Sequence, residues 1–151
     1  MAEIGMLDIY IDGACQPNPG GHTSYGVVVK HMEDTIYKES GYLGESPSFS
    51  NNVAEYYALI QALSYLKKTT EIYVALIHSD SKLLVEQMEG RWAVREGKYL
   101  PYYNRAKSLV KELLDQRITV FFRWIPKEKN LEANRLAILE LSKASTAGRY
   151  S

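Results

Sequence analysis

The chain has 151 residues with 46% apolar and 24% charged side chains, a composition that excludes disordered and fibrous classes and favours one globular domain. Its single cysteine, Cys15, excludes a disulfide framework and suits a reducing compartment. The net charge is zero, but residues 1–80 carry 4 basic and 10 acidic side chains and residues 81–151 carry 14 and 8, which gives net charges of −6 and +6. This asymmetry fits either an acidic, cation-binding centre beside basic surfaces for a polyanion, or ordinary solvated surfaces.

The sequence contains no pattern typical of a targeting or membrane segment. Its longest aliphatic runs, such as residues 74–77, are four residues long, whereas a bilayer requires about 20. The chain does not open with the basic, apolar and small-residue regions of a signal peptide. We therefore expect a cytoplasmic protein without membrane contact.

The first part of the chain predicts three strands joined by tight turns. Residues 6–12 alternate apolar and polar side chains, and glycines and prolines follow at residues 13–21. Residues 25–30 form a returning strand in this prediction, and residues 35–43 form a third. Together the three strands predict an antiparallel meander.

The remainder of the chain alternates predicted helices and strands. The predicted helices cover residues 53–67, 82–89, 100–115 and 131–143, and the predicted strands cover residues 72–77 and 118–124. The order βββαβααβα predicts an α/β fold in a single domain of residues 1–151. Within that domain we expect a core of residues 6–143 and a flexible tail of residues 144–151.

Two carboxylates stand where predicted strands end. Asp12 closes the first strand before the glycines, and Asp80 follows the fourth strand. If those strands are parallel neighbours joined through the first helix, both carboxylates emerge at one edge of the sheet. Glu55 lies in the first turn of that helix, where its alternative role is simple helix capping. The alternative role of the two aspartates is to cap turns.

Three carboxylates that converge near basic side chains suit Mg²⁺ or Mn²⁺, which favour oxygen ligands. A pair of such ions about 4 Å apart can hydrolyse a phosphodiester without a protein nucleophile. A nucleophilic mechanism has less support, because Cys15 has no evident base and is expected to be a packed or groove-lining residue. The three histidines show no ligand spacing, and the chain has neither a P-loop nor a dinucleotide-binding turn.

Four segments resemble the type 1 ribonuclease H family, in the same order. They are DGACQPNPGG at residues 12–21, SNNVAEYYALIQAL at 50–63, SDSKLLVEQM at 79–88 and RWIPKEKNLEANRLA at 123–137. The resemblance covers residues 6 to about 143. It implies a five-stranded mixed sheet flanked by helices, and an endonuclease that uses two divalent metal ions to cut the RNA strand of an RNA–DNA hybrid, leaving 5′-phosphate and 3′-hydroxyl ends.

The resemblance also implies the catalytic residues. Asp12, Glu55 and Asp80 match the first three carboxylates of the family, whereas Asn134 occupies the position of a fourth, an aspartate. The implied mechanism has Asp12 bridge both metal ions, Glu55 and the scissile phosphate complete one metal site, Asp80 position the attacking water, and Asn134 lie in a weakened second site. Glu132, two residues away on the helix, points off this face. We hypothesise a deliberate Asp→Asn inactivation, with a natural enzyme of low activity as the second interpretation.

The family resemblance assigns further residues to the substrate. Asn18, Ser50, Asn51 and Asn52 match polar positions that contact the hybrid, where amides and hydroxyls can meet phosphates and 2′-hydroxyls, although Ser50 to Asn52 also read as a helix N-cap. The chain has a short segment at residues 91–99 where many relatives carry a basic handle, so it is a handle-less form. Each of the other candidate contacts could instead be an ordinary core residue or a solvated surface residue. They are Cys15, Trp92, Arg123, Lys127 and Lys129.

Two other functions stay open. One is a catalytically inactive module that binds hybrids, and the other is a different metal-dependent nuclease on the same fold, such as a transposase or a Holliday-junction resolvase. Double-stranded RNA is a second candidate substrate. We expect a monomer.

Overall fold

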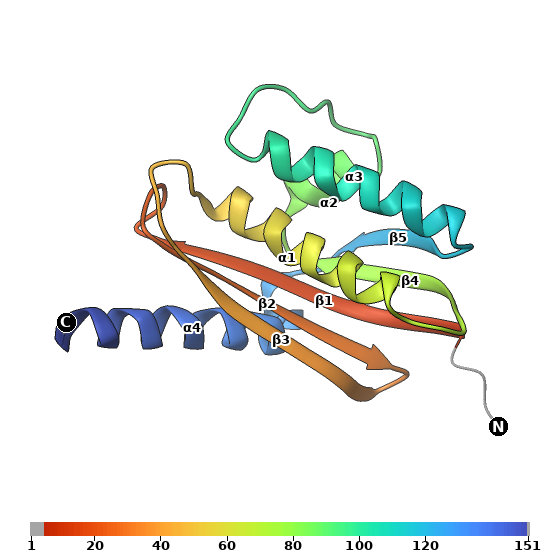
Figure 1. Ribbon diagram of the computed structural model, residues 1–151, viewed down its shortest axis with the longest axis horizontal. Coiled ribbons are helices and arrows are strands. Elements are labelled where there is room, and N and C mark those ends of the chain that lie inside the picture. The colour runs from red at the N-terminus through yellow and green to blue at the C-terminus, as the bar shows by residue number, and fades with distance from the viewer. Residues whose placement is uncertain (1–4, 151) are drawn as a thin grey trace.

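The computed structural model describes residues 5–150, with side chains up to residue 144. Five strands form one sheet in the order β3-β2-β1-β4-β5 (Figure 1). The strands are β1 (Gly5–Gln16), β2 (His22–His31), β3 (Asp34–Glu45), β4 (Ile72–Ser79) and β5 (Thr119–Trp124). Strands β1, β2 and β3 pair antiparallel, whereas β4 runs parallel to both β1 and β5.

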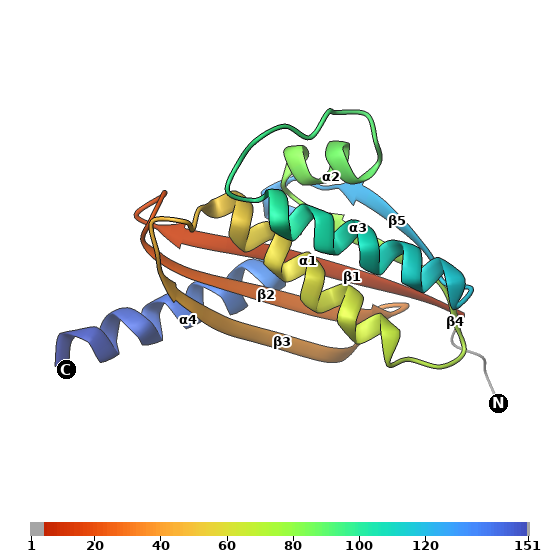
Figure 2. The ribbon, with the colours of Figure 1, turned by 45° about the horizontal axis from the view of Figure 1, so that its top comes forward.

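Helices cover both faces of this sheet. Figures 1 and 2 show α1, α2 and α3 on one side and α4 on the other. The helices are α1 (Asn51–Lys67), α2 (Lys82–Met88), α3 (Leu100–Asp115) and α4 (Leu131–Tyr150), with a single 3₁₀ turn (Lys127–Lys129) before α4. None of the helices in the described part of the chain is long and apolar enough to cross a bilayer.

The parallel pairing of β1 and β4 determines where the site forms. Ile11 is in register with Ser79, so both strands end at the same edge of the sheet. The connection between them runs through α1, as expected for a βαβ unit. Gly13 allows this helix to approach closely, because a Cβ atom there would lie 2.3 Å from the backbone carbon of Ala54. The first turn of α1 therefore packs directly on the end of β1.

The core lies between the sheet and the layer of α1, α2 and α3. Alternate side chains of β1 and β4 are fully buried there, as period-two strands require. Helix α1 contributes a row of buried residues at helical spacing, including Tyr56, Leu59, Leu63 and Leu66. This packing leaves the carboxyl ends of the central strands at the rim of the core.

The predicted fold class and order of elements are confirmed, and several boundaries differ, two of them by four residues or more. β1 continues to Gln16, past the predicted end at residue 12, because residues 13–16 pair with β2 and leave only residues 17–21 for the turn. Helix α4 continues to Tyr150, seven residues past its predicted end at residue 143, and the flexibility of residues 144–151 stays a prediction. This segment contains no proline, and its one glycine costs a helix only about 1 kcal/mol. Ser151 lies outside the described residues.

Candidate active site

The first candidate ligand, Asp12, lies in β1 where the strand passes the first turn of α1. Its side chain is 3% exposed. One carboxylate oxygen accepts a hydrogen bond from the backbone N–H of Gly13 at 2.9 Å. The other accepts one from the side-chain amide of Asn134, on α4, at 2.8 Å. Asp12 is therefore held by the backbone of its own strand and by α4.

Glu55 reaches the same place from α1. The helix begins because Ser50, in an extended conformation, accepts a hydrogen bond from the N–H of Val53 at 3.2 Å. Glu55 is buried, and its Oε2 atom has no hydrogen-bond partner among the described residues. A buried carboxylate oxygen without a partner is costly, so this atom has unused capacity to bind a cation.

Asp80 follows the last residue of β4 and is half-buried. Its Oδ2 accepts a hydrogen bond from the side chain of Asn130 at 3.2 Å. The same amide donates to the carbonyl oxygen of Ile11 at 2.8 Å. Asn130, which is 1% exposed, thus ties Asp80 to the backbone of β1 next to Asp12.

Ligand oxygens of Asp12, Glu55 and Asp80 all lie within 4.8 Å of one another. Burial raises the pKa of Glu55 well above its usual value, and the negative charges of Asp12 and Asp80 raise it further. Burial and the charge of Asp12 also raise the pKa of Asp80, although the hydrogen bond from Asn130 and the charge of Lys127 oppose the shift. A divalent cation would remove this repulsion, and three carboxylates are the donor set that Mg²⁺ and Mn²⁺ prefer.

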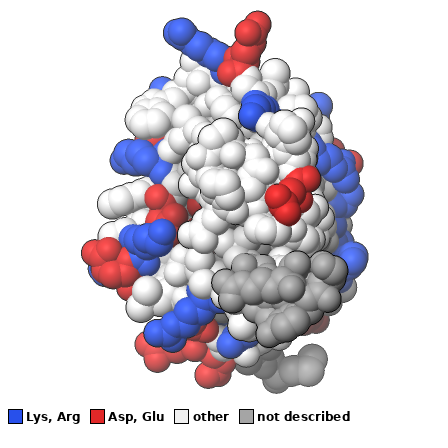
Figure 3. All heavy atoms as spheres, turned by 90° about the vertical axis from the view of Figure 1, so that its left-hand side faces the viewer, with Lys and Arg blue, Asp and Glu red and all other residues white. Residues whose placement is uncertain are grey.

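A cleft of about 540 Å³ opens over the carboxylates. Figure 3 views the end of the molecule toward which β1 points and shows lysine and arginine side chains around an uncharged centre, with acidic side chains among them. The charge is therefore mixed, and the basic residues of the second half of the chain do not form one continuous surface on this face. The cleft is lined by residues from β1, α1, α4 and the two strand ends, including Cys15, Asn51, Asn52, Ser81, Trp124, Lys127 and Asn134.

Several polar residues that the sequence assigned to the substrate also hold the loops of the site together. The side-chain oxygen of Asn51 accepts a hydrogen bond from the N–H of Cys15 at 2.8 Å. The side-chain oxygen of Asn18 accepts one from the N–H of Asn51 at 3.0 Å. Since Ser50 caps α1, three of the four have a structural task in the protein without substrate. Asn52, also at the start of α1, lines the cleft.

The other candidate contacts divide into two groups. Cys15 is buried at the cleft wall, and Lys127 lines the cleft. Trp92 and Arg123 are absent from the lining. Trp92 is exposed in the segment after α2, and Arg123 pairs with His78 in the sheet and alternates to the face opposite that of Trp124. Lys129 lies in the 3₁₀ turn and lines a separate, smaller hollow.

Two residues that form hydrogen bonds with Asp80, Asn130 and Trp124, were missing from the sequence-based site. Asn130 precedes α4, and a signal existed in its position at the start of the Asn-x-x-Ala segment. Trp124 is the last residue of β5. The edge argument that selected Asp12 and Asp80 would have included it, because β5 is parallel to β4.

The sequence and the fold have known relatives. A family model described as reverse transcriptase-like matches residues 10–139. A protein of Mycobacterium tuberculosis described as bifunctional is 38% identical over 131 residues, which cover 85% of this chain and 34% of that relative, so the chain spans about a third of its length. The protein EbsB of Enterococcus faecalis is 33% identical over 139 residues, which cover 91% of this chain and 96% of that protein.

Solved structures give the same picture. The N-terminal ribonuclease H domain of the mycobacterial protein is similar with a TM-score of 0.81 and 31% identity, covering 95% of this chain and 99% of that domain. LC11-RNase H1, solved in complex with an RNA/DNA hybrid, is similar with a TM-score of 0.81 and 32% identity, covering 91% of this chain and 98% of that one.

Proposed function

Because the chain belongs to the reverse transcriptase-like family of ribonuclease H-like domains, we propose that it is an endonuclease that hydrolyses the RNA strand of RNA–DNA hybrids. The observation that carries this proposal is the convergence of Asp12, Glu55 and Asp80 within 4.8 Å in an open cleft. The substrate is inferred from the likeness to a ribonuclease H1 that was solved with such a hybrid.

The donor set fits a divalent metal cofactor. Asp12, Glu55 and Asp80 would hold Mg²⁺ or Mn²⁺, and the partnerless oxygen of Glu55 supplies a buried ligand atom. We propose two ions, with Asn134 beside the second. When bound, the ions supply Lewis-acid stabilisation of the scissile phosphate and activation of the attacking water.

The protein itself contributes position and charge. Asp12, at the centre of the cluster and held by Gly13 and Asn134, would keep its orientation throughout a turnover. Asp80 is oriented by Asn130, so its free oxygen would face the attacking water and orient it toward the phosphate. Attack on phosphorus with departure of the ribose 3′-oxygen leaves a 5′-phosphate and a 3′-hydroxyl.

Asn134 weakens this site in our proposal. Its amide N–H donates to Asp12, so the end of the side chain that faces the cluster is a donor, which cannot ligate a cation. Even after rotation, the amide oxygen would bring no negative charge. This contact favours a second candidate, a module that binds hybrids without cutting them. An engineered Asp→Asn change and a natural enzyme of low activity both lead to this arrangement.

Recognition of the hybrid would be independent of base sequence. Asn52, Asn51 and Ser50 stand at the start of α1 beside the carboxylates, where amide and hydroxyl groups can contact the 2′-hydroxyls that distinguish RNA from DNA. Asn18, Cys15 and Lys127 complete this surface in our proposal, and Trp92 and Arg123 would contact the duplex only outside the cleft. We further propose that the protein acts as a monomer in the cytoplasm, and that double-stranded RNA is a second substrate.

A gel assay tests the function. The protein and its Asn134→Asp variant are incubated with Mg²⁺ and end-labelled RNA–DNA hybrid, duplex RNA or duplex DNA. We expect cleavage of the RNA strand of the hybrid alone or together with duplex RNA, and a rate at least about tenfold higher for Asn134→Asp. Cleavage of duplex DNA in preference to the hybrid would contradict the proposal, and retention of uncut hybrid by both proteins would establish the binding module instead.

A further inference from the structure

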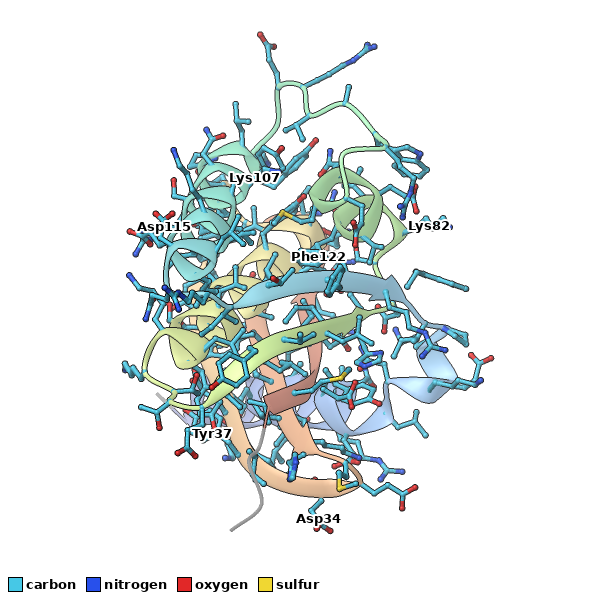
Figure 4. All side chains as sticks on the ribbon, turned by 90° about the vertical axis from the view of Figure 1, so that its right-hand side faces the viewer. Asp34, Tyr37, Lys82, Lys107, Asp115 and Phe122 are labelled. Carbon is cyan, nitrogen blue, oxygen red and sulfur yellow. The ribbon has the colours of Figure 1, made fainter. Side chains whose placement is uncertain are left out.

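Trp124 is an exposed aromatic residue at the wall of the cleft. It ends β5 on the same face as Phe122, which Figure 4 shows pointing from β5 toward the helices. Its indole N–H donates to the carbonyl oxygen of Asp80 at 3.2 Å, so the ring is fixed beside a proposed metal ligand. The residue nevertheless remains 43% exposed, which is unusual for a tryptophan whose only polar atom is bonded.

Lys82 is held against this ring. It begins α2, two residues after Asp80, and Figure 4 shows it at the outer edge of the molecule near β5. Its ammonium nitrogen lies 5.4 Å from the centroid of the Trp124 ring, within cation–π range. The side chain is 58% exposed.

The other contact of Lys82 does not explain its presence. Its ammonium is 3.7 Å from Glu86, one turn along α2. Glu86 already receives two shorter hydrogen bonds from Arg91, at 2.6 and 2.9 Å. Since Arg91 satisfies this carboxylate, the charge of Lys82 remains available beside Trp124, although Lys82 itself does not line the cleft.

We propose that Trp124 and Lys82 form a subsite for the nucleotide adjacent to the scissile phosphate, a proposal that rests on the hybrid as substrate. The exposed part of the indole packs against a ribose, and the ammonium of Lys82 pairs with the next phosphate. A ribose is favoured over a base because the paired bases of a duplex are stacked inside it, whereas sugars and phosphates line its surface. The N–H bond to Asp80 couples the subsite to the carboxylates.

The first experiment follows Trp124 by fluorescence, since the chain has only two tryptophans. The Trp92→Phe variant leaves Trp124 as the sole tryptophan, which is excited at a wavelength where the tyrosines do not absorb. A 12-base-pair RNA–DNA hybrid is added in buffer with Ca²⁺, which takes the same oxygen ligands, and a gel verifies that the hybrid stays intact. We expect the bimolecular quenching of Trp124 by acrylamide to fall at least about twofold when the hybrid binds.

The second experiment measures hybrid affinity against salt. Lys82→Gln should weaken binding about three- to tenfold and reduce the slope of log K against log salt concentration by about 0.7 to 0.9, the effect of one lost phosphate contact. Lys68→Gln is the matched control, because Lys68 caps the end of α1 remote from Glu55, about 20 Å along the helix. It should leave both quantities unchanged.

Two further variants distinguish the contact of the Trp124 ring with the hybrid from its hydrogen bond to Asp80. Trp124→Ala should weaken hybrid binding about five- to tenfold, whereas Trp124→Phe, which keeps an aromatic face but loses the N–H donor, should weaken it about twofold or less. Equal losses for both would mean that the bond to Asp80 carries the effect, and would overturn the subsite. Unchanged acrylamide quenching of Trp124, or equal salt slopes of hybrid affinity for Lys82→Gln and Lys68→Gln, would overturn the subsite. Neither result would contradict the proposed cleavage of hybrids. Failure of the parent protein to bind hybrid at all would overturn both.

Discussion

Carboxylates occur in two opposite settings in this molecule. Asp12, Glu55 and Asp80 crowd together at the sheet edge, and no basic side chain in the described part of the chain forms an ion pair with them within 4 Å. Glu132, two residues from Asn134 on α4, instead pairs with Lys30 of β2 at 2.6 Å.

The same chemical group therefore has opposite pKa shifts in the two settings. Burial and neighbouring negative charges raise the pKa of Glu55 well above its usual value. The hydrogen bond from Lys30, aided by the charges of Lys30 and Lys38, lowers the pKa of Glu132. The pair of Lys30 and Glu132 therefore stabilises the fold. The cluster of Asp12, Glu55 and Asp80 destabilises it, and a bound cation would offset this cost.

The largest effect should come from removing the central member of the cluster. We expect Asp12→Asn to lower the rate of hybrid cleavage by at least about 10³-fold, since several kcal/mol of metal-dependent stabilisation of the transition state would be lost. Glu132→Gln, the control from the other setting, should cleave at the parental rate. Initial rates for the three proteins, measured in the Asn134→Asp background for sensitivity, make the comparison. Comparable losses of cleavage rate in Asp12→Asn and Glu132→Gln would contradict the assignment of catalysis to the clustered carboxylates alone.

A second test uses the metal as a probe of stability. If the cluster binds a divalent cation, Mg²⁺ at about 100 times its dissociation constant should stabilise the native state by about 2.7 kcal/mol. For a chain of this size, that raises the melting temperature by roughly 5–10 °C. The Glu132→Gln variant should respond as the parent does, and Asp12→Asn should not respond. Equal responses of all three in thermal melts would place the stabilising ion elsewhere.

The sequence predicted the clustered setting better than the paired one. The sequence pattern puts Asp12 at the predicted end of the first strand and Asp80 after the fourth. The rule that parallel strands end at one edge then brings them together without any knowledge of side-chain packing, although β1 itself continues to Gln16. The resemblance to ribonucleases H implied the role of Glu55. The close approach of α1 to Gly13, which brings Glu55 to the site, was not predicted. The pairing of Lys30 with Glu132 joins residues 102 positions apart, and no local pattern predicts such a contact.

Packing also decided what the sequence left out. In the sequence, Asn130 is recognisable as the residue that precedes a predicted helix. Only the structure shows that its side-chain amide bridges Ile11 and Asp80. The end of α4 was misjudged because the small polar residues after position 144 resemble a tail, although none of them prevents a helix. The strand and helix spacing was sufficient for the order of elements, and the resemblance to ribonucleases H implied the mixed sheet. The polar contacts of the site depended on three-dimensional neighbours.

A third, smaller effect should appear in the metal-free protein. Glu55→Gln removes a buried like charge, and at pH 8 we expect it to raise the free energy of unfolding by about 1 to 3 kcal/mol, from unit charges about 5 Å apart at an effective dielectric constant near 20. Because the pKa of Glu55 is raised in the folded state, the native protein binds the extra proton. Stability should therefore fall as pH rises above the usual glutamate value, by at most about 1.4 kcal/mol per pH unit. Urea titrations in EDTA should show this slope in the parent and its loss in Glu55→Gln.

The smallest effect should come from the paired setting, with the opposite sign. The pKa of Glu132 is lowered by Lys30, so the pair stabilises the fold above the unfolded pKa of glutamate and loses that contribution as pH falls through the folded pKa. Both side chains are partly exposed, so solvent screening limits the contribution to less than about 1 kcal/mol. Glu132→Gln should accordingly destabilise the protein slightly at pH 7 and not at pH 3, and salt should reduce the difference. An increase in stability of Glu132→Gln at pH 7, like the increase expected for Glu55→Gln at pH 8, would contradict this prediction. It would mean that pairing with Lys30 is not what distinguishes Glu132 from the clustered carboxylates.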